Sequence, residues 1–334
     1  MTAPDLPFEL KAALEAKLHG LSRSEAAERA ARISQTYRGG GGSAAIRSEA
    51  DALAYALARM PATYAAVTAS LNALREVRPD FAPKRLLDIG AGPGTATWAA
   101  AEAFSSLADF TSIDANTALR ALALDLFGKS SRLLTVQYTQ GEARAVLSHA
   151  EPADLVVASY LVGEISDTER AAIANLMWSK TSDTLIIVEP GTPAGYARII
   201  ELRRQLIALG AHVAAPCPHD RECPLVAPDW CHFAQRLPRS RAHKALKGAE
   251  LPFEDEKFAY VALTRASVER HPARVLAQPE VGKVEVTAKL CTRDGLVITR
   301  VPRRTKADYA RARRWRWGDA VVDVPNTSAS ASSS

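Results

Sequence analysis

From residue 85 to 190 the chain alternates short apolar runs with segments of helical length. The runs are RLLDIG, ADFTSID, LLTVQYT, DLVVASY and TLIIVEP, and a later run, KFAYVALTR, has the same character. Continuous apolar runs are typical of strands buried on both faces, and strands that alternate with helices form a mainly parallel, doubly wound sheet. We therefore predict a Rossmann-like α/β core over residues 79–210, completed by 257–266.

The segments on either side of this core follow other patterns. LKAALEAKLHG and EAAERAARIS favour helices, Gly39–Gly42 predicts a loop, and DALAYALARMPATYAAVTASLNAL predicts a helix kinked or broken at Pro61. Residues 281–302 predict a hairpin with Asp294 and Gly295 at its turn. We thus expect a helical region (1–78), a cysteine-rich insertion (211–256), a basic β extension (267–318) and a disordered tail (319–334).

A glycine-rich turn, LDIGAGPG, ends the first predicted strand and leads into a predicted helix. Its G-x-G-x-G spacing after Asp88 differs from the G-x-G-x-x-G of dinucleotide enzymes, and an acid beside the loop suits a cationic ligand better than a pyrophosphate. Asp114 ends the next strand, where a carboxylate can accept hydrogen bonds from ribose hydroxyls. The pattern looks like the signature of class I S-adenosylmethionine methyltransferases. A turn that only packs helix on sheet is the structural alternative.

Resemblance to that fold extends to two further strand ends. It implies that Glu142 flanks an adenine and that Ser159 and Tyr160 lie where methyltransferases keep catalytic residues. The segment ASYLVGEI has no Asn/Asp-Pro-Pro-Tyr motif, and no cysteine stands there as a nucleophile for pyrimidine C5. We therefore predict an S-adenosylmethionine site without an identified catalytic residue, built from Asp88, Gly90, Gly92, Gly94, Asp114, Glu142, Ser159 and Tyr160.

The beginning of the sequence bears on the compartment. MTAPDLPFELK lacks the basic and apolar regions of a secretion signal, and Asp5 and Glu9 argue against an acid-poor mitochondrial transit peptide. No run approaches 18 consecutive apolar residues, so we expect no membrane association. The sequence predicts the cytoplasm.

All four cysteines fall within one window of 75 residues, from Cys217 to Cys291. A reducing compartment disfavours disulfides, so a metal or cluster site is the better interpretation. The C-x5-C-x7-C spacing and the distant fourth cysteine differ from zinc ribbons, and four thiolates suit either zinc or an iron–sulfur cluster. His219 and His232 are expected to be hydrogen-bonding neighbours more often than ligands.

Charge is distributed unevenly along the chain. Residues 236–316 contain 20 Lys/Arg and 9 Asp/Glu, a net of +11 against +5 for the whole chain. A positive field of this kind attracts polyanions, although a solvated basic surface would look the same. Trp315 and Trp317 interleave with the cations as stacking surfaces or as core anchors. The predicted RNA contacts are Arg300, Arg303, Arg304, Lys306, Arg311, Arg313, Arg314 and Arg316.

Most of residues 37–318 resemble one family: the methyltransferase-like assembly factors of the mitochondrial small ribosomal subunit and their bacterial relatives. The resemblance rests on LLDIGAGPGTATWA, SYLVGEI, VEPGTPAG, CPHDRECPL, DWCHF, KLCTRDGL and ARRWRWGD. It implies a 4Fe-4S cluster on Cys217, Cys223, Cys231 and Cys291.

The resemblance also implies partners: small-subunit rRNA and the immature small ribosomal subunit. We expect an assembly factor without an obligate homo-oligomer. The alternatives are an active S-adenosylmethionine-dependent rRNA methyltransferase and a switch that senses redox state or iron through a labile cluster.

Overall fold

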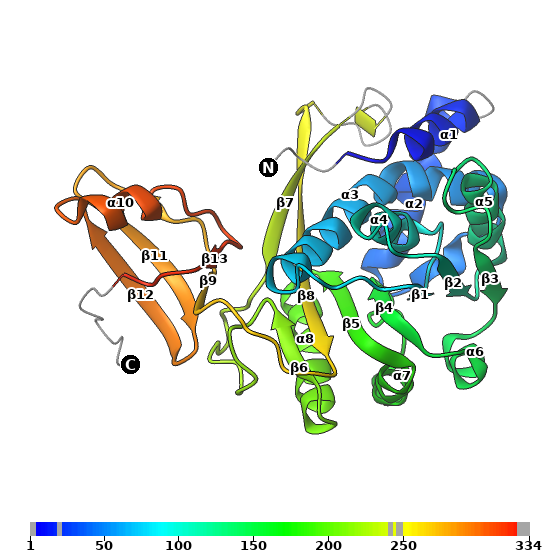
Figure 1. Cartoon of the computed structure of the whole chain (residues 1–334). Helices are drawn as coiled ribbons and strands as arrows, with labels where there is room; N and C mark the ends of the chain where they lie inside the picture. The colour runs from blue at the N-terminus through cyan, green and yellow to red at the C-terminus, as the bar shows by residue number, and fades with distance from the viewer. Residues whose placement is uncertain (1–4, 19–21, 240–242, 245–249, 326–334) are drawn as a thin grey trace.

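The computed structural model describes residues 5–18, 22–239, 243–244 and 250–325, and their elements form two sheets (Figure 1). The larger sheet has the order β3-β2-β1-β4-β5-β8-β6, with β7 paired to β8. Neighbours from β3 to β5 are parallel, whereas β8 is antiparallel to β5, β6 and β7. This arrangement is the class I methyltransferase fold, which confirms the predicted fold class.

Most of the apolar runs in the sequence form the centre of this sheet because their side chains are buried on both faces, whereas LLTVQYT contributes only the edge strand β3, in which Tyr138 alone is buried. The strands are β1 (Arg85–Ile89), β2 (Asp109–Asp114), β3 (Gln137–Gln140), β4 (Ala153–Ser159), β5 (Thr181–Pro190), β6 (His212–Ala215), β7 (Phe233–Pro238) and β8 (Phe253–Thr264). The strand order reverses between β1 and β4, and the carboxyl ends of strands at such a switch point form a binding crevice.

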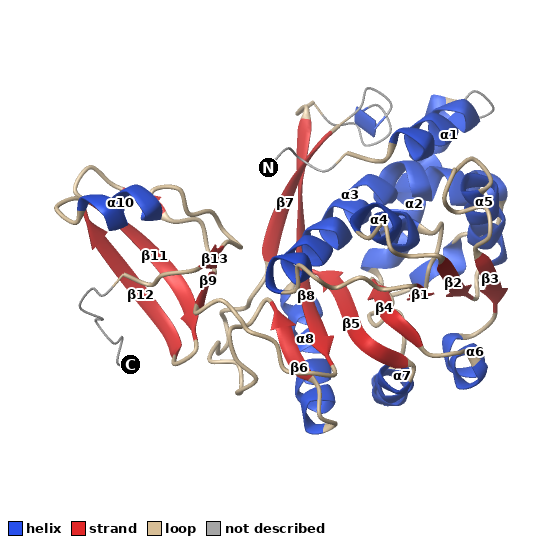
Figure 2. Cartoon of the chain, in the orientation of Figure 1, coloured by secondary structure: helices blue, strands red, loops and turns tan. Residues whose placement is uncertain are grey.

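Helices cover both faces of the sheet (Figure 2). One apolar core joins α3, α4 and α5 to it, and a second core joins α7 and α8 to the opposite face. The helices are α1 (Phe8–Leu18), α2 (Arg23–Arg38), the 3-10 helix η1 (Gly42–Ala45), α3 (Glu49–Val77), α4 (Thr95–Ala103), α5 (Thr117–Phe127), α6 (Ala143–His149), α7 (Asp167–Ser179) and α8 (Pro193–Ala208).

Helix α3 continues through Pro61 as one element, so the break that the sequence suggested there is not observed. Sixteen of its residues are buried, including Met60, Ala62 and Tyr64 around the proline. This packing compensates for the backbone hydrogen bond that a proline removes from a helix. None of the described helices has the length and apolar character needed to cross a membrane.

The smaller sheet lies at the C-terminal end and has the order β10-β11-β9-β13, with β12 paired to β11. The predicted hairpin is confirmed, with Arg293 and Asp294 as its loop between the paired Thr292 and Gly295. The elements are β9 (Ala273–Val275), β10 (Glu280–Val281), β11 (Glu285–Thr292), β12 (Gly295–Pro302), α10 (Lys306–Ala312) and β13 (Ala320–Val321).

Two segments differ from the sequence-based expectation. Strands β6 and β7 lie inside the segment 211–256, yet both pair with β8 of the core sheet, and the domain boundaries stay a prediction. The tail 319–334 was expected to be disordered. Part of it forms strand β13 instead, because this segment pairs with β9 and buries Val321. Residues 326–334 of that tail lie outside the described residues.

Candidate functional site

A cavity of about 1050 Å³ lies at the carboxyl ends of β1, β2 and β4. Parallel strands bring these ends to one edge, which is why residues far apart in sequence meet there. Six of the eight residues predicted for the cofactor line the cavity: Gly90, Gly92, Asp114, Glu142, Ser159 and Tyr160.

The glycine turn takes backbone conformations that favour glycine. Gly90, Gly92 and Gly94 have φ values of 70°, 54° and 82°. A Cβ atom on Gly92 would meet only Leu119, at 3.9 Å, so this glycine leaves its space to the cavity. A Cβ atom on Gly94 would overlap the Phe127 ring. Gly94 therefore packs the helix against its neighbour and does not line the cavity.

Asp88 also lies outside the cavity, beneath the turn. Its side chain is fully buried, and its Oδ2 accepts hydrogen bonds from the Thr97 backbone N–H at 3.0 Å and the Thr97 hydroxyl at 2.7 Å. Burial raises the pKa of Asp88 to about 7, although the bonds from Thr97 oppose this shift. Asp88 Oδ1 is buried without a hydrogen-bond partner. The carboxyl group thus anchors the start of α4 under the glycine turn.

Asp114 fixes the turn from the neighbouring strand. Its Oδ2 accepts the Gly92 backbone N–H at 2.8 Å, and its Oδ1 accepts the Asn116 N–H at 2.7 Å. The Tyr138 hydroxyl donates to the Gly92 carbonyl at 2.6 Å from the same side. Burial raises the pKa of Asp114. Each carboxylate oxygen keeps a second lone pair with which it can accept another hydrogen bond.

The N-terminal helical region forms a wall of the cavity that sequence reasoning missed. Tyr37, Ser43 and Tyr55 line it, and the rings of Tyr37 and Tyr55 stack with centroids 5.7 Å apart. The Asn116 side chain ties this wall to the core by donating to the Ser43 carbonyl at 3.0 Å and the Ile46 carbonyl at 2.9 Å. No local pattern marks these residues, since their partners lie about 70 positions away.

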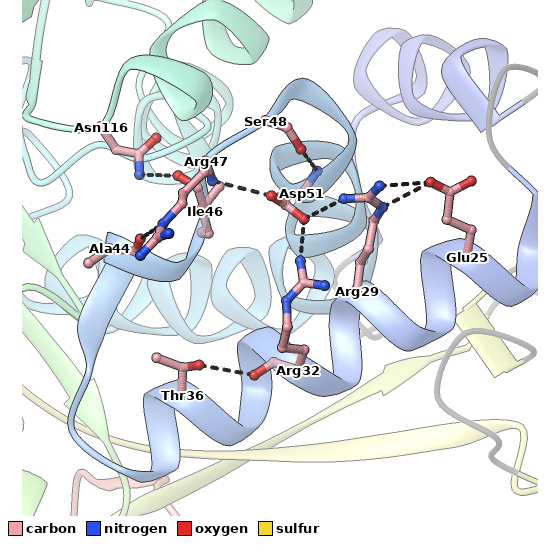
Figure 3. A network of polar contacts seen from close by, with 10 residues as sticks. All are labelled: Glu25, Arg29, Arg32, Thr36, Ala44, Ile46, Arg47, Ser48, Asp51 and Asn116. Carbon is pink, nitrogen blue, oxygen red and sulfur yellow. Dashed lines mark hydrogen bonds and ion pairs between the residues drawn. The ribbon is translucent and has the colours of Figure 1, made fainter.

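An ion-pair network centred on the buried Asp51 holds the wall in place (Figure 3). Asp51 at the start of α3 accepts from Arg29 at 2.8 Å and from Arg32 at 2.6 Å, both on α2. Arg29 is also paired with Glu25, one helical turn away. Because Asp51 is buried and Arg47 N–H also donates to it, the network fixes α2, η1 and α3 relative to one another.

A second cavity, of about 940 Å³, adjoins the first and shares Tyr37, Tyr55, Tyr160 and Glu164 with it. Tyr160 has a φ of 59°, in the left-handed region that a tyrosine rarely adopts. Its hydroxyl donates to Glu256 Oε1 at 2.7 Å. Strain of this kind persists only where the surroundings enforce it.

Glu189, which also lines the second cavity, is fully buried. Its Oε2 accepts from Arg198 Nε at 2.7 Å, whereas its Oε1 is buried without a partner. Burial raises the pKa of Glu189, although Arg198 opposes this shift. A carboxylate oxygen here can accept a hydrogen bond from a ligand in the cavity.

The four cysteines converge on a third, small cavity of about 30 Å³. Cys217 follows β6, Cys223 and Cys231 precede β7, and Cys291 lies on β11 of the smaller sheet. Burial and the neighbouring cysteines raise the pKa of the Cys231 thiol, and burial raises that of Cys291 to about 12. The described residues contain no group of three or more His, Cys, Asp or Glu that could hold a single metal ion.

The two histidines beside the cysteines make different contacts. His219 Nε2 lies 3.8 Å from Cys291 Sγ, and its Nδ1 is buried without a partner. His232 stacks on Trp230, while Trp317 donates to the His232 carbonyl at 2.8 Å. Trp317 thus anchors the end of the chain to the cysteine loop, and Trp315 packs against the smaller sheet, so both tryptophans act as core anchors.

The eight residues predicted to contact RNA are all exposed, on β12, α10 and the turns that flank the helix. Arg311 pairs with Asp308 and Asp323, and the Arg313 guanidinium lies over the Tyr309 ring at 5.7 Å. In Figure 1, α10 lies across the upper end of the smaller sheet, next to β11 and β12.

Residues 49–322 match the family model described as "Mitochondrial small ribosomal subunit Rsm22". The chain belongs to the Rsm22 family. It is 30% identical over 297 residues to human "Ribosome assembly protein METTL17, mitochondrial", covering 82% of this chain and 63% of that protein. It is 26% identical over 322 residues to "Rsm22-cox11 tandem protein 2, mitochondrial" of Schizosaccharomyces pombe, covering 80% of this chain and 42% of that protein. This Rsm22-family chain thus spans between about two fifths and two thirds of these relatives' lengths.

Solved structures align with this member of the Rsm22 family at low scores. A magnesium protoporphyrin IX methyltransferase from Synechocystis PCC 6803 with bound SAM gives a TM-score of 0.41 at 11% identity, covering 61% of this chain and 80% of that one. A putative RNA methyltransferase from Pyrococcus horikoshii gives 0.38 at 11% identity, covering 59% and 80%. The fold assignment rests on the strand order.

The comparison corrects one expectation. The predicted cytoplasmic location is wrong, because the matched relatives in the Rsm22 family are mitochondrial proteins by name. The argument against a mitochondrial transit peptide rested on Asp5 and Glu9, and both make contacts within the described structure. Asp5 pairs with Lys11 at 3.0 Å, and Glu9 on α1 accepts from the Ser131 N–H at 3.1 Å.

Proposed function

We propose that this chain is an assembly factor of the small ribosomal subunit that uses a methyltransferase fold as a binding scaffold. The observation that carries the proposal is the meeting of four cysteines, from both sheets, in one cavity beside a basic extension. The Rsm22 family is described by the mitochondrial small ribosomal subunit and the human relative as a ribosome assembly protein, which supports the same role.

S-adenosylmethionine is the proposed ligand of the large cavity. Asp114 has lone pairs for ribose hydroxyls, Gly92 leaves room for close approach, and Glu142 lines the cavity with a carboxylate that could accept from an adenine amino group. The cavity is large enough for a cofactor of this size, since ligand pockets of about 300–1,000 Å³ are typical. Asp88 then acts indirectly, by holding the glycine turn from below.

The proposed occupant of the cysteine site is a 4Fe-4S cluster on Cys217, Cys223, Cys231 and Cys291. In a cubane each thiolate binds its own iron, so the four sulfurs need not converge on one ion, as a zinc ion requires. An all-thiol set at the contact between the two sheets fits this group. When bound, the cluster would join the smaller sheet to the core by covalent bonds.

Small-subunit rRNA is the proposed partner of the basic segment 236–316. Exposed guanidinium groups on β12 and α10 can contact phosphates, and phosphate contacts give most of the affinity of such interfaces. Trp315 and Trp317 support this surface by packing against the smaller sheet and the core.

An active rRNA methyltransferase is the second candidate. The second cavity favours it, because it meets the first at Tyr160 and Glu164, where a methyl acceptor would have to reach the cofactor. The unpartnered Glu189 Oε1 supplies a hydrogen-bond acceptor in that cavity. Incubation of small subunits with S-adenosylmethionine carrying a labelled methyl group distinguishes the two candidates, since a pure assembly factor transfers no label.

The full-length protein, purified without oxygen, tests the main proposal. It should co-sediment with immature small subunits in preference to mature ones. Equal binding to both, or binding to neither, would contradict an assembly role.

A further inference from the structure

Two arginines line the cysteine cavity. Arg203 lies on α8 and Arg274 on β9, and their side chains are only 3% and 5% exposed. Buried arginines are rare unless an anion compensates their charge. Their position raises the question of which anion these two guanidinium groups face.

Both side chains hold backbone of the loop that carries the first cysteine. Arg203 Nη2 donates to the His219 carbonyl at 2.7 Å, and Arg274 Nε donates to the Pro216 carbonyl at 3.1 Å. Arg274 Nη1 also donates to the Gly318 carbonyl at 2.9 Å. The two guanidinium groups therefore bind the backbone just before and just after Cys217. Arg274 also joins this loop to Gly318.

Carboxylates of the described residues do not compensate these charges. Every described ion pair within 4.0 Å involves other side chains, so neither guanidinium has an acid partner in this part of the chain. Asp319 feels the field of Arg274 but is bound by the Arg316 N–H at 2.8 Å. Arg203 Nε is buried without a partner. The remaining titratable groups that line this cavity are the four thiols and the phenols of Tyr196 and Tyr260, whose pKa values burial raises.

The arginines and the cysteines interact electrostatically. Both guanidinium groups line the same small cavity as the four cysteines, so they lie close to any charge that is placed there. Two positive charges are thus built into the wall of a cavity that all four cysteines line. A site of this kind is matched to a bound group of charge minus two.

We propose that Arg203 and Arg274 are positioning residues that neutralise the charge of the cluster and set its reduction potential. The inference rests on the proposed cluster. A 4Fe-4S core of charge plus two with four thiolates carries minus two, and one added electron makes it minus three. Fixed positive charges stabilise the more negative, reduced form, so they raise the potential and retain the cluster.

The test uses the anaerobically purified protein and its Arg203→Gln and Arg274→Gln variants, titrated with dithionite in the presence of redox mediators. Each substitution should lower the midpoint potential. The midpoint potential should fall by at least about 59 mV. For a one-electron couple this shift changes the ratio of oxidised to reduced cluster tenfold at fixed potential. Bleaching by an iron chelator should also be faster in both variants.

Three controls make the result specific. Arg265→Gln removes an arginine that donates to the Thr181 carbonyl and lies over Trp178, away from the cysteines, and should keep the wild-type potential. The Arg203→Lys and Arg274→Lys variants keep the charge and should also stay close to it, which preserves the test if a Gln variant fails to fold.

The possible failures separate cleanly. Wild-type protein without iron and sulfide would refute the proposed cluster itself, whatever the arginines do. A cluster-containing wild type whose folded Gln variants titrate at the same potential and bleach at the same rate would refute only the role of the arginines. If the Lys variants, which keep the charge, change the ratio of oxidised to reduced cluster tenfold as well, the charge mechanism would be refuted.

Discussion

The Ser43 backbone N–H donates to Glu164 Oε2 at 2.9 Å, although 121 positions separate the two residues. This bond joins η1 of the N-terminal wall to the segment that follows β4, at the junction of the two large cavities. Burial raises the pKa of Glu164, and the bond from Ser43 opposes the rise. The wall therefore depends on a carboxylate of the core.

Glu164→Ala should weaken S-adenosylmethionine binding several-fold, because removal of this acceptor frees the wall of the cavity. A hydrogen bond of this kind contributes about 1 kcal/mol. Glu164→Gln keeps an acceptor oxygen and should bind like the wild type, and Glu151→Ala, at an exposed position, is the second control. Calorimetry is the measurement. An Ala variant with unchanged affinity would show that the wall does not depend on this bond.

Gly92→Ala should abolish or strongly reduce S-adenosylmethionine binding while the protein stays folded. The new methyl group would project into the cavity, with Leu119 at 3.9 Å as its nearest neighbour. The positive φ adds a strain of about 1 kcal/mol. Gly210→Ala is the matched control, because Gly210 has a φ of 85° and no atom within 4 Å of an added Cβ. If affinity falls equally in both variants, strain rather than steric exclusion is responsible.

Asp88 should make the stability depend on pH. Its pKa is about 7 in the folded protein against an ordinary value of 3.8, so between these values the folded chain retains a proton that the unfolded chain has released. Stability from this group is therefore full below about pH 4 and is lost as pH rises to about 7. The total is on the order of 4 kcal/mol at about 1.4 kcal/mol per pKa unit.

Asp88→Asn should remove this dependence. The Asn carbonyl can still accept the two bonds from Thr97, and an amide does not titrate in this range. Thermal unfolding of both proteins between about pH 4 and 8 is the measurement. A variant whose stability falls with pH as steeply as that of the wild type would assign the dependence to other groups.

Cys291→Ser should remove the proposed cluster and loosen both sheets, because Cys291 is the one cysteine contributed by the smaller sheet. The purified variant should be colourless, and hydrogen exchange should rise in β11 and in the loop before β7. Iron, sulfide and zinc analysis of the wild type gives the reference. One zinc per colourless wild-type molecule would contradict the cluster.

The sequence predicts the elements that depend on local pattern. The apolar runs become β1, β2, β4 and β5 because their burial on both faces is visible in the residues themselves. Strand β6, four residues long, has no such signal, since it forms only by pairing with the distant β8. The hairpin could be predicted because its two strands are neighbours in sequence, whereas β6 and its partner β8 are far apart.

Site residues marked by a local motif could also be predicted, whereas those placed by contacts between distant segments could not. The glycine turn and Asp114 follow from a motif, whereas the motif could not show that Asp88 points away from the cavity. Tyr55 and Arg274 reach their sites through contacts between distant segments, and no spacing marks them. The sequence could group the cysteines because of their residue type. It could not show that they line one cavity, because that depends on the contact between the two sheets.

The central claim, an assembly factor that binds rRNA through its basic extension, is tested most directly by reversing charge on that extension. Arg303, Arg304, Arg313 and Arg314 are exposed and lie outside the three cavities. Changing all four to Glu should abolish co-sedimentation with immature small subunits and leave cluster and cofactor content unchanged.

The salt dependence gives the quantitative measure. For single-charge variants of the same set, each substitution that removes a phosphate interaction should flatten the logarithmic salt dependence of binding by about 0.7 to 0.9. The matched control changes four exposed cations outside the extension to Glu: Arg75, Lys84, Lys129 and Arg204. We expect the control to sediment with the subunits and the extension variant to stay in the supernatant. A folded extension variant that still co-sediments like the wild type would contradict the account.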